Sequence, residues 1–241
     1  MQAGDVGFVF IHGAGGTQSK WRSIQSGMRG YRASYVDLPG HGANALEPQA
    51  SIEAYATGLS DTIQGDVIVV GHSMGGMIGI ELAARNQHVK GLALVASHYA
   101  LPVHDRILSQ LKEGSFPESL FYASYRKPVN PQLLEQEKEE ISLVPVETTY
   151  LDFRACNSYV NGREAIARLN IPILALYGAD DRLLPVAAQD NLMQANTLAS
   201  ATSVTEAGHY VMLERPQDVV DALLAFEDRV VRQQCHKWLK P

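Results

Sequence analysis

The chain has 241 residues, of which 46% are hydrophobic and 19% charged, and this ordinary globular composition excludes a mostly disordered protein. Its 20 Lys and Arg against 26 Asp and Glu give a net charge of −6, which argues against nucleic acid or an anionic membrane as a partner. No apolar run approaches the roughly 20 residues of a membrane span, and Met1–Asp5 lacks the start of a signal peptide, so we expect a cytoplasmic protein.

Short apolar runs alternate along the chain with segments whose apolar residues recur at helical spacing. Strands that are apolar on both faces suit a parallel sheet covered by helices. The alternation therefore predicts an α/β protein with a doubly wound, mostly parallel sheet. The predicted strands are Val6–Ile11, Tyr31–Val36, Val67–Val70, Leu92–Val95 and Ile173–Tyr177. The predicted helices are Ser51–Ile63, Met74–Ala84, Val186–Asn196 and Pro216–Arg232.

The alternation breaks between Leu101 and Val160, where no buried strand is predicted. A stretch of this length is too long for a plain loop inside a compact domain. We therefore expect a small helical insertion over one end of the sheet. Aromatic residues cluster in it, Phe121 and Tyr125 among them, and the charged run Glu135–Glu140 predicts a solvent-exposed helix face.

The segment Gly71-His72-Ser73-Met74-Gly75 matches the pattern G-x-S-x-G between a predicted strand and a predicted helix. A strand that turns abruptly into a helix strains the residue at the turn, and small residues two positions away avoid clashes. The hydroxyl then stands at a helix N-terminus, where free N–H groups favour developing negative charge. The pattern predicts Ser73 as a nucleophile, and we expect its neighbour His72 to point away from the hydroxyl.

A serine nucleophile needs a general base, and the base needs a carboxylate that orients it. Our candidate base is His209, which lies directly before the last predicted helix. The segment Gly178–Pro185 follows a predicted strand and so lies at the edge where parallel sheets bind their ligands. We expect one of its two acids, Asp180 or Asp181, to orient the histidine and the other to cap the turn.

A glycine-rich segment, His12–Gly16, follows the first predicted strand. Glycines let backbone N–H groups approach a reacting atom, so the N–H groups of Ala14 and Met74 are candidates for an oxyanion hole. The patterns G-x-x-x-x-G-K-[ST] and G-x-G-x-x-G before a helix are absent, which argues against a bound nucleotide. We expect no metal ion and no organic cofactor.

Together these segments resemble the α/β-hydrolase family, and in particular its small esterase-like members. The resemblance includes the turn Asp37–Gly42 (D-L-P-G-H-G), and its spacing favours Asp181 as the acid, in the family's order of Ser73, Asp181 and His209. It implies about six strands, because the family's first hairpin is missing. It also implies a cap over residues 101–160, inserted between the core segments 1–100 and 161–241.

The resemblance implies a serine carboxylesterase for small to medium acyl esters. Ser73 counts against relatives with an aspartate nucleophile, and Met77 and Ile78 stand where menaquinone-pathway synthases and carbon–carbon-bond hydrolases usually carry arginine. Two alternatives remain: a lyase or synthase that uses the same triad as a base, and a receptor-like member with little turnover. The first would need a cation in its pocket, for which the candidates are Arg126, Arg154 and Arg182. Candidate substrate-binding residues are His98, Tyr99, Phe121 and Tyr125.

Overall fold

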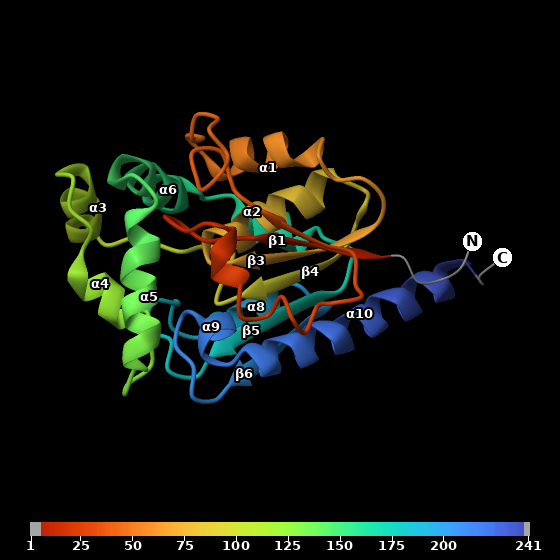
Figure 1. The fold of residues 1–241 in the computed structure, drawn as a ribbon. Coiled ribbons are helices and arrows are strands. Elements are labelled where there is room, and N and C mark those ends of the chain that lie inside the picture. Colours follow the sequence, from red (N-terminus) through yellow and green to blue (C-terminus); the bar gives the residue numbers. More distant parts are fainter. Residues whose placement is uncertain (1–5, 239–241) are drawn as a thin grey trace.

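The computed structural model describes residues 6–238, and a parallel sheet of six strands forms its centre (Figure 1). Met1–Asp5, which entered the expectation about a signal peptide, lies outside these residues. The strand order is β2-β1-β3-β4-β5-β6, so the direction of winding reverses between β1 and β3, where open α/β sheets bind their ligands. The strands are β1 (Gly7–Ile11), β2 (Ala33–Val36), β3 (Val67–His72), β4 (Val89–Val95), β5 (Ile173–Gly178) and β6 (Ala199–Val204).

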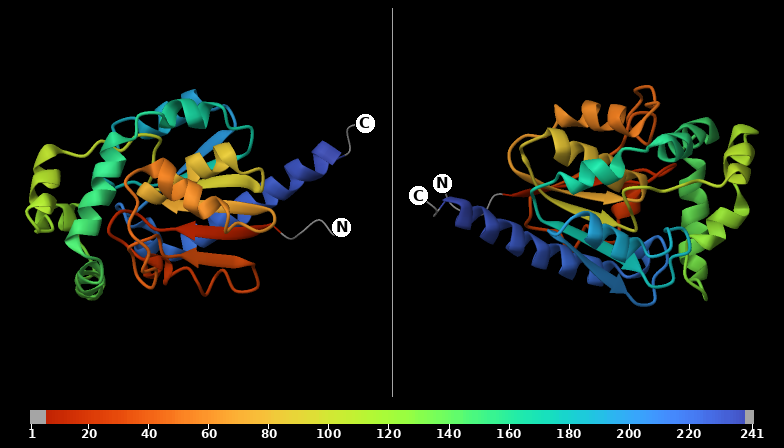
Figure 2. Two further views of the ribbon diagram at one scale, coloured as in Figure 1. Left: turned by 90° about the horizontal axis from the view of Figure 1, so that it is seen from above. Right: turned by 180° about the vertical axis from the view of Figure 1, so that it is seen from behind.

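Helices cover both faces of the sheet, as the predicted doubly wound fold requires (Figure 2). Side chains alternate between the faces along β3: Val67 and Val69 enter one hydrophobic core, and Ile68 and Val70 enter the other. The first core is shared with α1 (Ile52–Ser60), α2 (Met74–Arg85), α7 (Gly162–Ala167) and α8 (Ala188–Ala195). The second core is shared with η1 (Gln18–Trp21), α9 (Val211–Glu214) and α10 (Pro216–Trp238).

The remaining helices lie together at one end of the sheet, away from the C-terminal part of α10 (Figures 1 and 2). They follow the carboxyl end of β4 and precede β5, so they stand over the edge at which the strands end. We call residues 101–160 the cap. Its helices are α3 (Asp105–Lys112), α4 (Glu118–Ala123), α5 (Pro131–Ser142) and α6 (Val146–Ser158).

The predicted solvent-exposed face of Glu135–Glu140 is present, since residues 135, 136, 138 and 139 are exposed, but one residue of the run departs from it. Glu137, in the charged run of α5, is fully buried. Its carboxylate lies 2.5 Å from Lys20 Nζ and 2.8 Å from Arg22 Nη2, and it accepts a hydrogen bond from the Tyr125 hydroxyl. Two cations from the core thus compensate the buried carboxylate, a partnership that the local charge pattern does not reveal.

The two cysteines, Cys156 and Cys235, are free thiols. In the described part of the chain, no helix combines the length and the apolar character needed to cross a membrane.

Candidate active site

Ser73 occupies a sharp turn between β3 and α2, with a backbone φ of 50°. Two glycines make this turn possible. A Cβ atom on Gly71 would collide with the backbone of Gly75, and a Cβ on Gly75 would lie 2.6 Å from the carbonyl oxygen of His12 and closer still to that of Ile11. The G-x-S-x-G pattern therefore reflects close backbone contact on both sides of the serine.

His209 and Asp181 are hydrogen-bonded, with 2.9 Å between His209 Nδ1 and Asp181 Oδ2. Asp181 Oδ1 accepts a second bond, from the Leu183 N–H at 2.8 Å. Burial alone would raise the pKa of Asp181, but the charge and hydrogen bond of His209, together with the N–H groups of Leu183 and Leu184, outweigh burial and lower it. Since Nδ1 faces the carboxylate, His209 has Nε2 left for a proton from a nucleophile. Asp180 is exposed, so of the two acids only Asp181 reaches the histidine.

Hydrogen bonds to its backbone hold the loop that carries His209 from two sides. The His209 N–H donates to the carbonyl oxygen of Ser124 in the cap at 2.8 Å, and His72 Nε2–H donates to the carbonyl oxygen of His209 at 3.1 Å. Burial, together with the nearby His209, lowers the pKa of His72 well below its ordinary value, so its ring is neutral. The ring of His72 lines the cavity and supports the loop of the candidate base, and the expectation that it points away from the Ser73 hydroxyl stays a prediction.

The segment His12–Gly16 lies against the serine. A Cβ on Gly13 would lie 3.0 Å from Ser73 Cβ and 2.8 Å from His72 Nδ1, so only glycine permits this approach. The N–H of Ala14 has no acceptor among the described residues. The N–H of Met74 lies in the first turn of α2, where N–H groups have no acceptor within the helix. Neither candidate oxyanion donor is thus paired with an acceptor from the described residues.

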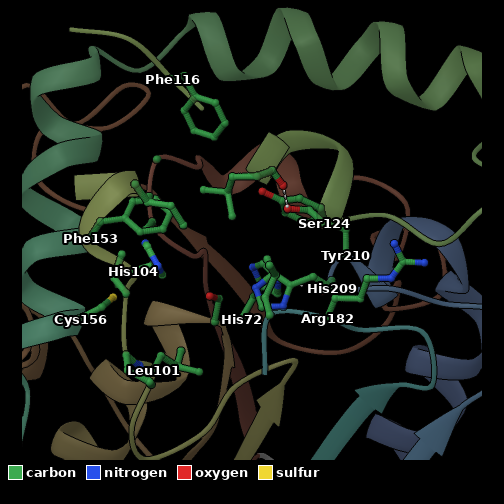
Figure 3. Close-up of a pocket in the computed structure, with 18 of the residues that line it drawn as sticks. His72, Leu101, His104, Phe116, Ser124, Phe153, Cys156, Arg182, His209 and Tyr210 are labelled. Atoms are coloured by element: carbon green, nitrogen blue, oxygen red, sulfur yellow. Dashed lines mark hydrogen bonds between the residues drawn. The ribbon is translucent and has the colours of Figure 1, made fainter. Parts of the chain in front are cut away.

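A cavity of about 220 Å³ joins these groups (Figure 3). Ser73, His209 and Ala14 line it from the core, and the cap supplies most of the remaining wall. The cap wall is mainly apolar: Leu101, Val103, Ile107, Phe116, Leu120, Ile141, Phe153 and Cys156. Arg182 and His104 are the basic side chains that join this wall beside His72 and His209.

None of the four candidate substrate-binding residues is among those that line this cavity. Tyr125 is fully buried between the cap and the core, and Phe121 packs against it with 5.4 Å between ring centroids. His98 is buried after β4, with Tyr99 against its ring at 3.8 Å between centroids. The prediction that these residues line the pocket is therefore wrong. Helical periodicity places aromatic residues in the cap but does not say which side of each helix faces the sheet.

The three arginines proposed for an anionic substrate also differ in position. Arg126 forms an ion pair with Glu206, with 3.1 Å between Nη1 and Oε1, and Arg154 is exposed with its guanidinium over the Tyr150 ring. Neither lines the cavity, whereas Arg182 lines it and is exposed to solvent. Of these three arginines, Arg182 therefore is the one that lines the cavity.

The fold and this arrangement define an α/β hydrolase, and the chain belongs to the alpha/beta hydrolase family, whose model matches residues 8–222. A relative with 27% identity, covering 92% of this chain and 94% of its own, is the 2-succinyl-6-hydroxy-2,4-cyclohexadiene-1-carboxylate synthase of Salmonella paratyphi B. Among solved structures, a thermophilic esterase matches with a TM-score of 0.80 and 25% identity over 92% of this chain and 90% of its own. The enol-lactonase of Burkholderia xenovorans LB400 shares the fold, with a TM-score of 0.82 and 20% identity over 94% and 93% of the two chains.

Proposed function

We propose that this protein is a serine esterase that hydrolyses carboxylic esters with small to medium, uncharged acyl groups. The observation that carries the proposal is the shared cavity. Ser73 and the Asp181–His209 pair meet there beneath a cap wall that is mainly apolar. An apolar wall favours binding of an uncharged acyl chain, and a volume of about 220 Å³ favours a small one.

In this reaction Ser73 Oγ attacks the ester carbonyl while its proton moves to His209 Nε2. The tetrahedral intermediate expels the alcohol, which takes that proton, and an acyl-enzyme remains. Water then attacks the acyl carbonyl with His209 again as base, which releases the acid and restores the serine hydroxyl. Asp181 holds Nδ1–H throughout, so that Nε2 is the nitrogen that exchanges protons.

The two free N–H groups supply the electrostatic part of the mechanism. Negative charge that develops on the carbonyl oxygen would lie between the N–H of Ala14 and that of Met74 at the N-terminus of α2. Each such donor contributes roughly 3–4 kcal/mol to the stability of the transition state.

A synthase or lyase is the second candidate, because the matching Salmonella protein carries a synthase name. The product in that name bears a carboxylate and a succinyl group, so its pocket has to accept negative charge. In this chain Arg126 is paired with Glu206, Arg154 is outside the cavity, and Arg182, which lines the cavity, is exposed to solvent. The placement of these cations favours the esterase over the synthase. A receptor-like binder needs no nucleophile, so the presence of Ser73 and the Asp181–His209 pair at one cavity favours the esterase over this alternative as well.

Pre-steady-state hydrolysis of p-nitrophenyl acetate, butyrate and octanoate tests this proposal. An esterase releases a burst of p-nitrophenol close to one equivalent of enzyme, and mass spectrometry of the quenched sample shows the acyl group on Ser73. Ser73→Ala removes the burst and lowers kcat by about 10³-fold or more. Slow, burst-free hydrolysis that survives Ser73→Ala would show that this serine forms no acyl-enzyme and would favour the alternatives.

A further inference from the structure

We propose that Asp152, in cap helix α6, is a positioning residue that holds the loop His12–Gly16 where the Ala14 N–H can serve the oxyanion. The proposal rests on the esterase function proposed above. It assigns a role in catalysis to a side chain of the cap that does not line the cavity.

Asp152 is fully buried and collects three hydrogen-bond donors from three separate segments. Its Oδ2 accepts the Gly15 N–H at 2.8 Å and His41 Nε2–H at 2.8 Å, and its Oδ1 accepts the Tyr55 hydroxyl at 2.9 Å. Gly15 adjoins the candidate donor Ala14, while His41 belongs to the D-L-P-G-H-G turn and Tyr55 to α1. One carboxylate of the cap therefore ties together the loop and two parts of the core.

The surroundings of the partner His41 favour its protonated form. Its Nε2 faces Asp152, and its Nδ1 lies 2.9 Å from the carbonyl oxygen of Pro39, so both ring nitrogens need a proton to donate. Burial alone would lower the pKa of His41, but the hydrogen bond and charge of Asp152 and the Pro39 carbonyl raise it above its ordinary value. The result is a buried ion pair with every bond of the histidine satisfied, and charge-assisted bonds of this kind are the strong ones.

The loop is confined on its other sides as well. Gly15 has a φ of +63°, and a Cβ there would lie 2.8 Å from the side chain of Thr149, one turn before Asp152 on α6. His12 Nδ1–H donates to the carbonyl oxygen of Gly13 at 2.8 Å, and His12 Nε2 accepts the Leu38 N–H at 3.1 Å. Burial and the adjacent His41 lower the pKa of His12 to about 4, so this ring is neutral and keeps one tautomer.

This confinement matters because an oxyanion donor works only over a narrow range of positions, about 2.7–3.1 Å from the developing charge. Asp152 bonds to the N–H of Gly15 and leaves that of Ala14 free. Without the carboxylate, the Gly15 N–H would lose its partner and the loop would no longer be fixed toward Ser73. The expected effect is therefore on kcat, because the acyl-binding wall of the cavity does not change.

Asp152→Ala and Asp152→Asn test the role, with Tyr159→Phe as the matched control. Tyr159 also joins the end of α6 to the core through one buried hydrogen bond, from its hydroxyl to Glu81 Oε1 at 2.7 Å, but it does not touch the loop. For each protein kcat, KM and the melting temperature are measured on p-nitrophenyl butyrate. The rate constant for phosphonylation of Ser73 by a fluorophosphonate is measured in parallel.

We expect Asp152→Ala to lower kcat and the phosphonylation rate by about 10²-fold while KM changes by less than about threefold. Asp152→Asn keeps an oxygen for Gly15 and can turn its amide toward the Tyr55 hydroxyl, so it should recover about tenfold of the loss. Tyr159→Phe should lower the melting temperature and leave both rates unchanged. If Asp152→Ala does not fold, the Asn variant alone has to show the fall in kcat at unchanged KM.

The proposal is overturned if the Asp152 variants phosphonylate and turn over like the wild type, or if they change the rates only as much as Tyr159→Phe does. The phosphonylation arm keeps this result separate from the proposed function. A wild type that reacts with the fluorophosphonate but hydrolyses no ester would refute the esterase, while the variant rates would still decide the role of Asp152.

Discussion

Replacing Asp181 by asparagine should abolish most of the activity through the tautomer of His209. Asp181 Oδ1 accepts the Leu183 N–H, so an amide at this position keeps its oxygen there and turns its NH2 toward His209 Nδ1, where Oδ2 now lies at 2.9 Å. The amide donates, so Nδ1 has to accept, and the ring proton moves to Nε2. A protonated Nε2 cannot take the proton of Ser73. We expect kcat to fall by about 10⁴-fold, which equals roughly 5.4 kcal/mol of transition-state stabilisation.

The assay compares Asp181→Asn with Asp180→Asn, a neighbour that is exposed and has no contact with the histidine. Asp180→Asn should keep kcat within about twofold and stability within about 0.5 kcal/mol. The pKa of Asp181 is lowered in the folded state, so its contribution to stability is complete above about pH 5 and is lost as the pH falls through the folded pKa. The melting temperatures of wild type and Asp181→Asn should therefore converge in acid. Loss of activity in Asp180→Asn, or activity of Asp181→Asn above a tenth of wild type, would refute this assignment of the acid.

Three further predictions follow from the cavity and the cap. Phe153→Trp fills part of the acyl-binding wall and should reduce kcat/KM for octanoate more than for acetate, and an unchanged ratio of the two would contradict the placement of the acyl chain. Glu137→Gln leaves Lys20 buried without a counter-charge and should cost about 3–5 kcal/mol in urea unfolding, whereas the exposed Glu139→Gln should cost less than about 0.5 kcal/mol. Arg182→Gln should leave kcat/KM for p-nitrophenyl butyrate within about twofold, because Arg182 is largely exposed beside the apolar wall, and a large loss would show that this arginine binds substrate.

The core of the fold was predictable because its strands are buried on both faces. β1, β3 and β5 are almost wholly apolar, and a run of that kind between helical periods has few other interpretations. β6 lies at the edge of the sheet with half-solvated residues, and its sequence Ala199–Val204 has no apolar run, so only the family resemblance implied a sixth strand. The predicted start of one strand is also too late: β4 begins at Val89, three residues before the predicted Leu92.

The candidate triad was predictable for a different reason: each member lies in a short loop whose glycines are required by backbone contact. Gly178, for example, cannot carry a Cβ because it would collide with the carbonyl oxygens of Gly208 and Ala207, so the loop of Asp181 and the loop of His209 lie in close contact. The cap offers no such local signal. Whether Phe121 or Phe116 faces the cavity depends on the rotation of α4 and its flanking segment, which is set by packing against residues far away in the chain.

In the proposed esterase the cap does more than select the acyl group, because it also holds both loops that carry the candidate machinery. The carbonyl oxygen of Ser124 accepts the N–H of His209, and Asp152 accepts the N–H of Gly15. From the core, Glu214 joins the same arrangement, since its two carboxylate oxygens accept the N–H groups of Gly208 and of Arg126 in the cap. Substitutions in the cavity wall can therefore change the substrate specificity, whereas the acceptors at Ser124 and Asp152 have to be kept. In the proposed esterase, the apolar residues of the cavity wall would determine which substrate binds, while these hydrogen-bond acceptors would keep the loops of Ala14 and His209 in position.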